Sequence, residues 1–180
     1  MGHHFDPFNP QPQSIDIRDI AIGLSNTCRF SGQIPEHYSV AQHSVIMSHQ
    51  VPDECALEAL LHDAAEAYLG DVPRPVKFGL PDYRRLSEIV ESAIALKYGL
   101  VYPWPDDVKD ADLRIVMTEG RDFGRDTSDW GITQAPYEFT IYPLMPQTCA
   151  DIFMDRFHEL YYSRIQMKQN VNAILSRSDD

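Results

Sequence analysis

Four side chains of this sequence have the types and the spacing to hold a divalent metal ion. His62 and Asp63 are adjacent, His43 lies 19 residues before His62, and Asp112 lies 49 residues after Asp63. Neutral imidazoles and carboxylates suit divalent transition metals. Two side chains cannot close such a site alone, so ligands must converge from several segments. The His62-Asp63 pair therefore predicts a site for one divalent ion (zinc, manganese, cobalt or a similar metal), with His43 and Asp112 as candidate further ligands.

The His62-Asp63 pair falls within a helix that the sequence predicts between Asp53 and Gly70. At about 100° per residue, His62, Asp63 and Glu66 lie within one sector of that helix. The opposite face is an apolar stripe with spacings of four, three and four residues, formed by Leu57, Leu61, Ala64 and Tyr68. The polar groups therefore share a face that is separate from the core.

Helical periodicity and end signals predict the rest of the fold. Helices are expected at about residues 15–24, 39–50, 82–98, 106–123 and 147–174. Pro73 and Pro75 are expected to prevent a helix from resuming after Gly70. Residues 124–146 are rich in turn-forming residues and predict a long surface loop, with one short strand at 138–141. The sequence thus predicts an all-α single domain over 1–180, with its core at about 15–125.

The composition limits the partners and the compartment. The 180 residues carry a net charge of −12, so a long nucleic acid, whose binding requires a positive surface, is not expected as a partner. No apolar run approaches the roughly 20 residues of a membrane span, and the N-terminus lacks the pattern of a secretory signal. The three cysteines are scattered, which indicates reduced thiols. We therefore expect a cytoplasmic protein without a membrane partner.

Three stretches carry a resemblance to a known family. They are SVAQHS at 39–44, LLHDAAEAY at 60–68 and DVPRPVK at 71–77. With Asp112, this ordered set resembles the HD-domain phosphohydrolases, and in particular their 5′-deoxynucleotidase branch. The chain is similar to enterobacterial prophage proteins of that branch and to phage dATP triphosphohydrolases. The likeness covers about residues 15–125, and more loosely 141–146 and the last helix, and it implies an HD-domain helical bundle.

The resemblance also implies roles for individual residues. His43, His62, Asp63 and Asp112 match the family's metal ligands. Glu66 matches the acid that orients or deprotonates the attacking water, and Asp71 matches the acid that protonates the leaving oxygen.

The substrate-binding residues implied by the resemblance are Arg29, Phe30, Lys77 and Lys109. Arg29 matches a residue that grips phosphate, and Phe30 stands where monophosphatase relatives place a tryptophan beside the sugar. Lys77 and Lys109 match lysines that bind the polyphosphate in phage triphosphohydrolases, where a further metal ion can sit on the substrate phosphates. An ordinary surface role for both lysines stays open.

The implied activity is hydrolysis of a 2′-deoxynucleotide at its 5′ phosphoester. The expected substrate is a deoxynucleoside triphosphate, dATP first, giving deoxynucleoside and triphosphate. Alternatives are a 5′-deoxynucleotidase acting on monophosphates, hydrolysis of a cyclic or alarmone nucleotide, and a non-catalytic module that binds a nucleotide. The partner in each case is a small-molecule nucleotide.

Two expectations concern residues outside this set. Glu119, seven residues after Asp112 on the same helix face, is interpreted as an ordinary charge on its helix, and a role in supporting the metal ligands stays open. A homo-oligomer is expected because relatives assemble and symmetric assembly is common. The apolar residues that the last helix offers for it are Phe153, Phe157, Leu160 and Tyr161.

Overall fold

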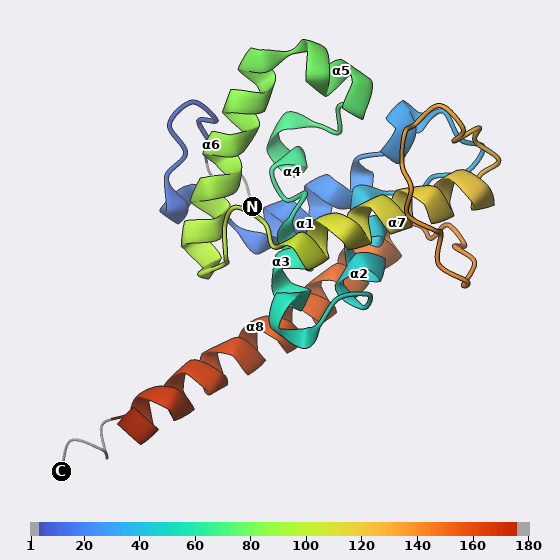
Figure 1. Ribbon diagram of the computed structural model, residues 1–180. Coiled ribbons are helices and arrows are strands. Elements are labelled where there is room, and N and C mark those ends of the chain that lie inside the picture. Colours follow the sequence, from blue (N-terminus) through green and yellow to red (C-terminus); the bar gives the residue numbers. More distant parts are fainter. Residues whose placement is uncertain (1–3, 176–180) are drawn as a thin grey trace.

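The computed structural model describes residues 4–175, and over these residues it is helical without strands, which confirms the predicted all-α class (Figure 1). The strand expected at 138–141 is wrong. This segment bends at residues 138–139 and pairs with no other strand in the described chain, and the Arg121 side chain donates to the carbonyl oxygens of Tyr137 and Phe139. Within the described chain, every helix is too short or too polar to cross a bilayer.

Eight α-helices follow one another along the described residues. They are α1 (Ile17–Asn26), α2 (Val40–Ser48), α3 (Ala56–Leu61), α4 (Glu66–Leu69), α5 (Arg74–Gly79), α6 (Pro81–Tyr98), α7 (Asp106–Asp122) and α8 (Pro146–Leu175). Short 3₁₀ turns occur at Pro12–Ser14, Arg29–Gly32 and Asp53–Cys55. A long irregular segment joins α7 to α8, as the sequence predicts.

The helix ends follow local side-chain chemistry. The Ser39 side chain accepts a hydrogen bond from the backbone N–H of Gln42 and caps α2, as the sequence predicts. The Asp16 side chain caps α1 by accepting from the N–H of Arg18. Gly99 ends α6 in the left-handed conformation, at φ 66°. These caps fix where each site-bearing helix begins or ends.

The single helix predicted between Asp53 and Gly70 is interrupted. α3 ends at Leu61, and residues 62–65 form a turn before α4 begins at Glu66. In this turn the N–H groups of Ala64 and Glu66 donate to carbonyl oxygens three residues back, rather than four. The tighter winding changes the directions of His62 and Asp63 from those of an ideal α-helix.

A second difference lies directly after this turn. The sequence predicts no helix between Gly70 and residue 82, but α5 begins at Arg74 with Pro75 in its first turn. Proline is tolerated there because the first helical N–H groups have no partner within the helix. Gly70, at φ 79°, reverses the chain between α4 and α5.

The core surrounds the first half of α8. Phe153 and Phe157 of α8 are buried against α1, α2 and α3, and Tyr98 of α6 stacks edge-on against Phe157. These two phenylalanines are therefore core residues and cannot supply an assembly surface, which corrects that expectation. The second half of α8 projects from the body of the protein (Figure 1).

One buried ion pair anchors α8 to the rest of the molecule. The Glu58 carboxylate on α3 is fully buried and accepts two hydrogen bonds from Arg164, at 2.8 and 2.6 Å. It also accepts from the N–H of Val101, at 3.0 Å. Burial raises the pKa of Glu58, but Arg164 and the Val101 N–H outweigh burial and hold the pKa below its usual range.

Replacing Arg164→Met is expected to destabilise the fold by about 3 kcal/mol, because it leaves a buried carboxylate without its cation. The difference from the wild type should be largest at neutral pH. It should shrink as the pH falls, first through the pKa of Glu58 in the variant, which burial raises once Arg164 is gone, and then through the lowered pKa of Glu58 in the wild type. Urea unfolding between pH 3 and 7 measures both effects. The exposed Arg85→Met is the control, and equal stability of the two variants would contradict the role of this pair.

Candidate metal centre

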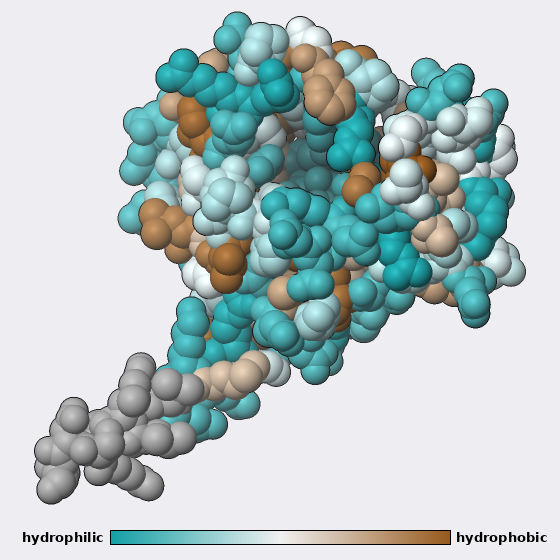
Figure 2. All heavy atoms as spheres, in the orientation of Figure 1, coloured by the Kyte–Doolittle hydropathy of each residue, from teal (hydrophilic) through white to brown (hydrophobic). Residues whose placement is uncertain are grey.

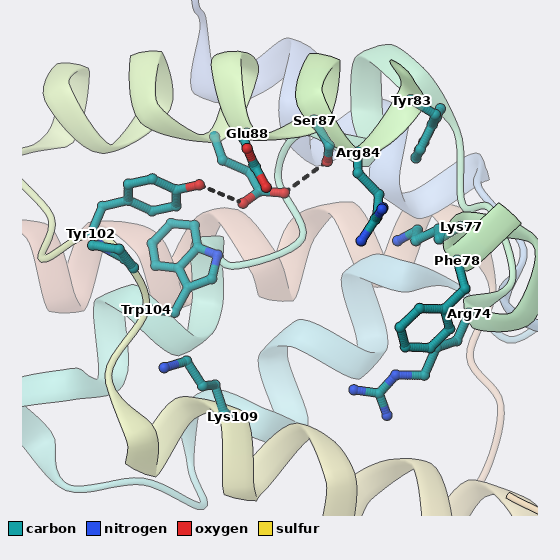
Figure 3. A pocket seen from close by; sticks show the side chains of 12 residues that line it. Arg74, Lys77, Phe78, Tyr83, Arg84, Ser87, Glu88, Tyr102, Trp104 and Lys109 are labelled. Atoms are coloured by element: carbon teal, nitrogen blue, oxygen red, sulfur yellow. Dashed lines mark hydrogen bonds between the residues drawn. The ribbon is translucent and has the colours of Figure 1, made fainter. Parts of the chain in front are cut away.

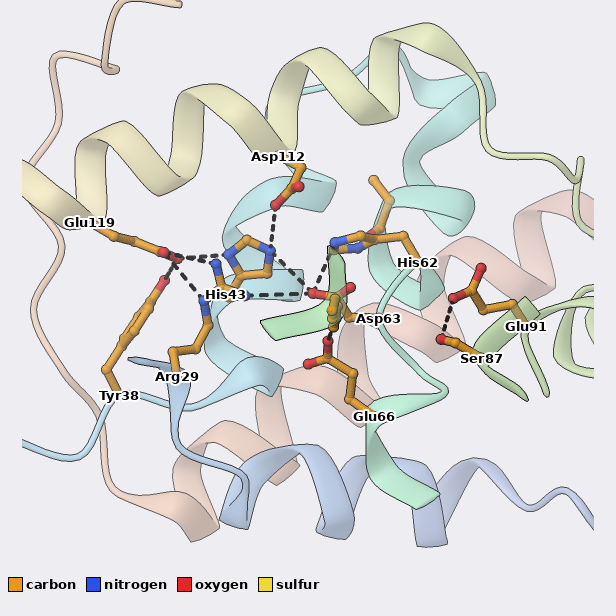
Figure 4. Close-up of polar contacts among 12 residues, drawn as sticks. Arg29, Tyr38, His43, His62, Asp63, Glu66, Ser87, Glu91, Asp112 and Glu119 are labelled. Carbon is orange, nitrogen blue, oxygen red and sulfur yellow. Dashed lines mark hydrogen bonds and ion pairs between the residues drawn. The ribbon is translucent and has the colours of Figure 1, made fainter. Parts of the chain in front are cut away.

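Three separate segments bring the predicted ligands together. His43 comes from α2, His62 and Asp63 from the turn between α3 and α4, and Asp112 from α7 (Figure 4). One donor atom each of His43, His62 and Asp112 lies within 4.8 Å of the others, so these three residues could hold a metal ion.

The carboxylate of Asp63 lies against the same two imidazoles. Its Oδ2 is 3.1 Å from Nε2 of His62 and 3.7 Å from Nε2 of His43. Oδ1 of Asp112 lies 3.4 Å from Nε2 of His43. All four residues of the predicted set therefore face one small volume, although Asp63 is not part of the tightest group.

The hydrogen bonds of the two rings leave Nε2 of each directed at this volume. Nδ1 of His62 lies 2.9 Å from the carbonyl oxygen of Ala59, and Nδ1 of His43 lies 2.7 Å from Oε1 of Glu119. Both oxygens are acceptors, so both Nδ1 atoms must donate. A neutral ring then carries its free lone pair on Nε2, which is the arrangement of a metal ligand with an outer partner.

The donor atoms that face this volume fit a cation. The Nε2 atoms of His43 and His62 are buried and make no hydrogen bond of acceptable geometry. In neutral imidazoles these lone pairs would face the carboxylates of Asp63 and Asp112, and acceptors that face each other repel. A cation between them, either a proton or a metal ion, removes that repulsion.

The same carboxylates raise the pKa values of both histidines. Burial and Arg29 lower the pKa of His43, but Glu119 and Asp112 outweigh them and raise it. Burial lowers the pKa of His62, yet Asp63 and Asp112 bring it to about 9. The neighbouring carboxylates thus favour positive charge on both rings, and a divalent ion competes with protons for their nitrogen atoms.

Glu119 is not the ordinary helix charge that the sequence interpretation favoured, and its position fits the supporting role that was left open. It is fully buried, and its carboxylate accepts hydrogen bonds from His43, from the Tyr38 hydroxyl at 2.9 Å and from Arg29 at 2.9 and 3.2 Å. Burial raises the pKa of Glu119, but Arg29 and His43 outweigh it and keep the pKa low. The seven-residue interval from Asp112 places both acids on one face of α7 and was the available signal.

Arg29 lies beside the centre, on a strained loop. Its Nε and Nη2 bind Glu119, and Nη1 lies 3.6 Å from Oδ2 of Asp63. The next residues, Phe30 and Ser31, adopt φ values of 55° and 53°, a conformation that costs of order 1–3 kcal/mol for non-glycine residues. Phe30 is half-buried and stacks on Trp130, with ring centroids 6.2 Å apart.

Glu66 and Lys77 meet on the other side of Asp63. Nζ of Lys77 donates to Oε1 of Glu66 at 2.6 Å, so this lysine is paired. The second oxygen, Oε2, is buried and has no hydrogen-bond partner in the described chain. Burial, followed by the charge of Asp63, raises the pKa of Glu66 well above its usual range, and Lys77 opposes the shift.

The remaining predicted residues differ in position. Asp71 is partly buried; burial raises its pKa, Asp63 adds to the shift, and Arg29 and Lys77 oppose it. Lys109 is exposed and pairs with Asp106 at 2.9 Å, so it is not among the residues that converge on the imidazoles.

A cleft of about 350 Å³ opens beside this centre (Figure 3). It lies between α5, α6 and the start of α7, and both Lys77 and Lys109 line it. Its position is visible as a hollow with a mostly hydrophilic rim on the face shown in Figure 2. Lys77 connects the cleft to the centre, because it lines the cleft and donates to Glu66, whereas none of the four predicted metal ligands lines it.

Comparison with known proteins finds relatives without an assigned activity. The chain is 45% identical over 163 residues to the uncharacterized protein YfdR of Escherichia coli, covering 88% of this chain and 92% of that protein. It is 36% identical over 120 residues to an uncharacterized protein of Rhodobacter capsulatus, covering 61% of each. No family model matches the sequence.

Glu119→Gln is expected to weaken divalent metal binding by about 10- to 100-fold. The amide is isosteric but lacks the charge that keeps Nδ1 of His43 protonated and Nε2 free. Calorimetric titration with Mn²⁺ or Zn²⁺ measures the affinity, and circular dichroism checks folding. Tyr38→Phe is the matched control, since it removes another bond to the same carboxylate and should change affinity by only a few-fold. Unchanged affinity in Glu119→Gln would contradict the assignment.

Proposed function

The chain belongs to the family of the Escherichia coli protein YfdR, and we propose that it is a metal-dependent phosphohydrolase of the HD type that cleaves 2′-deoxynucleotides at the 5′ phosphoester. The observation that carries the proposal is the pair of buried Nε2 atoms of His43 and His62, which face two carboxylates without hydrogen-bond partners of their own. Such a donor set fits one divalent ion, with Asp63 completing the group His43, His62 and Asp112.

A divalent ion at this position would act as a Lewis acid that makes water more acidic and withdraws charge from a phosphoryl oxygen. Glu66 takes the proton of the attacking water. Its Oε2 is available, and the ammonium of Lys77 opposes the raised pKa of Glu66 and favours the ionised carboxylate that a base needs. The bond from Lys77 to Oε1 fixes the orientation of this carboxylate.

Two further residues of the centre act on the phosphoester. Asp71, whose pKa is raised by burial, holds a proton more readily than an exposed aspartate and delivers it to the leaving 5′ oxygen. Arg29 presents Nη1 near Asp63 while Glu119 holds the rest of its guanidinium, so a positioned cation faces the phosphoryl oxygens. Phe30, on the same loop, is the proposed neighbour of the sugar.

The proposed substrate is a deoxynucleoside triphosphate, with dATP first, because Lys77 and Lys109 line a cleft that meets the centre. The cleft volume falls within the range of about 300–1,000 Å³ typical of small-molecule sites. One observation favours a monophosphate as the second candidate. Both lysines are already paired with acids, Lys77 with Glu66 and Lys109 with Asp106, so neither is a free cation.

Incubation of the metal-loaded protein with dATP is expected to release deoxyadenosine and inorganic triphosphate, read by product chromatography. The panel includes dAMP, the other deoxynucleotides and the ribonucleotides, each with several metals. Asp63→Ala should abolish the reaction because it removes a proposed metal ligand. Orthophosphate from dAMP, with dATP intact, would select the second candidate. No hydrolysis of any nucleotide with any metal would refute the proposed activity.

Glu66→Gln is expected to lower kcat by about 10²- to 10⁴-fold while changing metal affinity little, because the amide keeps the shape but cannot take a proton. Steady-state kinetics and calorimetric metal titration separate the two effects. The exposed Glu54→Gln serves as the control and should retain wild-type kcat. A Glu66→Gln protein with wild-type kcat would remove this residue from the reaction.

A further inference from the structure

The cleft beside the metal centre has two unlike ends. Figure 3 shows Arg74, Lys77 and Arg84 at one end, and Tyr102, Trp104 and Lys109 at the other. The lining includes four cationic side chains and two carboxylates, those of Glu88 and Glu91. Three of the four cations therefore gather at the end where Lys77 joins Glu66.

The two arginines differ from the two lysines in their partners. Lys77 and Lys109 each pair with a carboxylate, at 2.6 and 2.9 Å. Within residues 4–175, the guanidiniums of Arg74 and Arg84 make neither a hydrogen bond nor an ion pair, although both line the cleft. The carboxylate of Glu91, which lies on the same wall, is used by Ser87 and Tyr102 instead.

This end of the cleft, where Arg74, Lys77 and Arg84 gather, differs in charge from the acidic chain as a whole. The protein carries 27 acidic and 15 basic Lys and Arg residues, so acidic partners outnumber cations. Two unpaired guanidiniums and a lysine at one end of a concave surface repel one another, and a concave surface concentrates their field. An anion with several charged oxygens removes that repulsion and offers each guanidinium a two-pronged hydrogen bond.

We propose that Arg74 and Arg84 form an oligophosphate-binding end of the cleft, which holds the outer phosphates of a nucleoside triphosphate. The inference rests on the proposed function in one respect, since it takes the cleft as the place where the substrate lies. Lys77 links the two regions, because it binds Glu66 of the catalytic centre and lines the cleft with both arginines. The arginines thereby favour a triphosphate over a monophosphate, which is too short to use the metal centre and both guanidiniums.

The first test measures binding of inorganic tripolyphosphate to the full chain by calorimetry, without added divalent metal, which tripolyphosphate would chelate. Arg74→Met and Arg84→Met are each expected to weaken binding by about tenfold, because each removes charge-assisted hydrogen bonds. Arg85→Met is the matched control, since Arg85 is the next residue on α6, is also exposed and does not line the cleft. It should bind like the wild type, and orthophosphate should bind more weakly than tripolyphosphate to all proteins.

Equal binding of tripolyphosphate by Arg74→Met, Arg84→Met and Arg85→Met would overturn the inference, as would equal affinity of the wild type for orthophosphate and tripolyphosphate. The second test is the KM for dATP with metal present, expected to rise about tenfold in Arg74→Met and Arg84→Met. Unchanged KM values in an active enzyme would refute the inference but leave the proposed function standing. Arginine-dependent binding of tripolyphosphate without any hydrolysis would refute the proposed function and leave the oligophosphate site standing.

Discussion

A carboxylate buried away from water must be both neutralised and hydrogen-bonded, and Glu119 is the group on which this requirement falls most heavily. Its two oxygens are shared among Arg29, Tyr38 and His43, which come from separate segments of the chain. The same bonds set the direction of an imidazole, hold a guanidinium and attach α7 to α2. The buried carboxylate of Glu119 therefore orients the residues of the centre from the side that is away from the solvent.

The rest of the molecule supplies rigidity to this arrangement. The first half of α8 fills the core against α1, α2 and α3, and the Arg164–Glu58 pair fixes its continuation. The site segments are thus attached to packed helices, while the cleft is bounded on one side by short α5, whose apolar side chains are largely exposed. The metal centre therefore lies on firmly packed helices, whereas one wall of the cleft is a short and loosely packed helix.

Residue type and order were enough to predict the helical class, most helix positions and the convergence of His43, His62, Asp63 and Asp112. A helix cap such as Ser39 bonds a residue only three positions away, so the sequence alone can predict it. The interruption at residues 62–65 could not be predicted. Turns of α-helix and 3₁₀-helix are formed by the same residue types and differ only in whether each N–H donates to the carbonyl four or three residues back. Nor does a sequence show burial: Glu119 and an exposed helical glutamate read alike until a tertiary partner is known.

The strained loop at Arg29–Gly32 has a consequence for which sequences this fold tolerates. Phe30, Ser31 and Gly32 are consecutive residues with positive φ, at 55°, 53° and 71°. Asparagine or glycine would relax Ser31, whereas valine, isoleucine or threonine would crowd the backbone there. This bend sets the direction of the Arg29 guanidinium. A substitution at Ser31 would therefore shift that guanidinium through the backbone, without any direct contact with the centre.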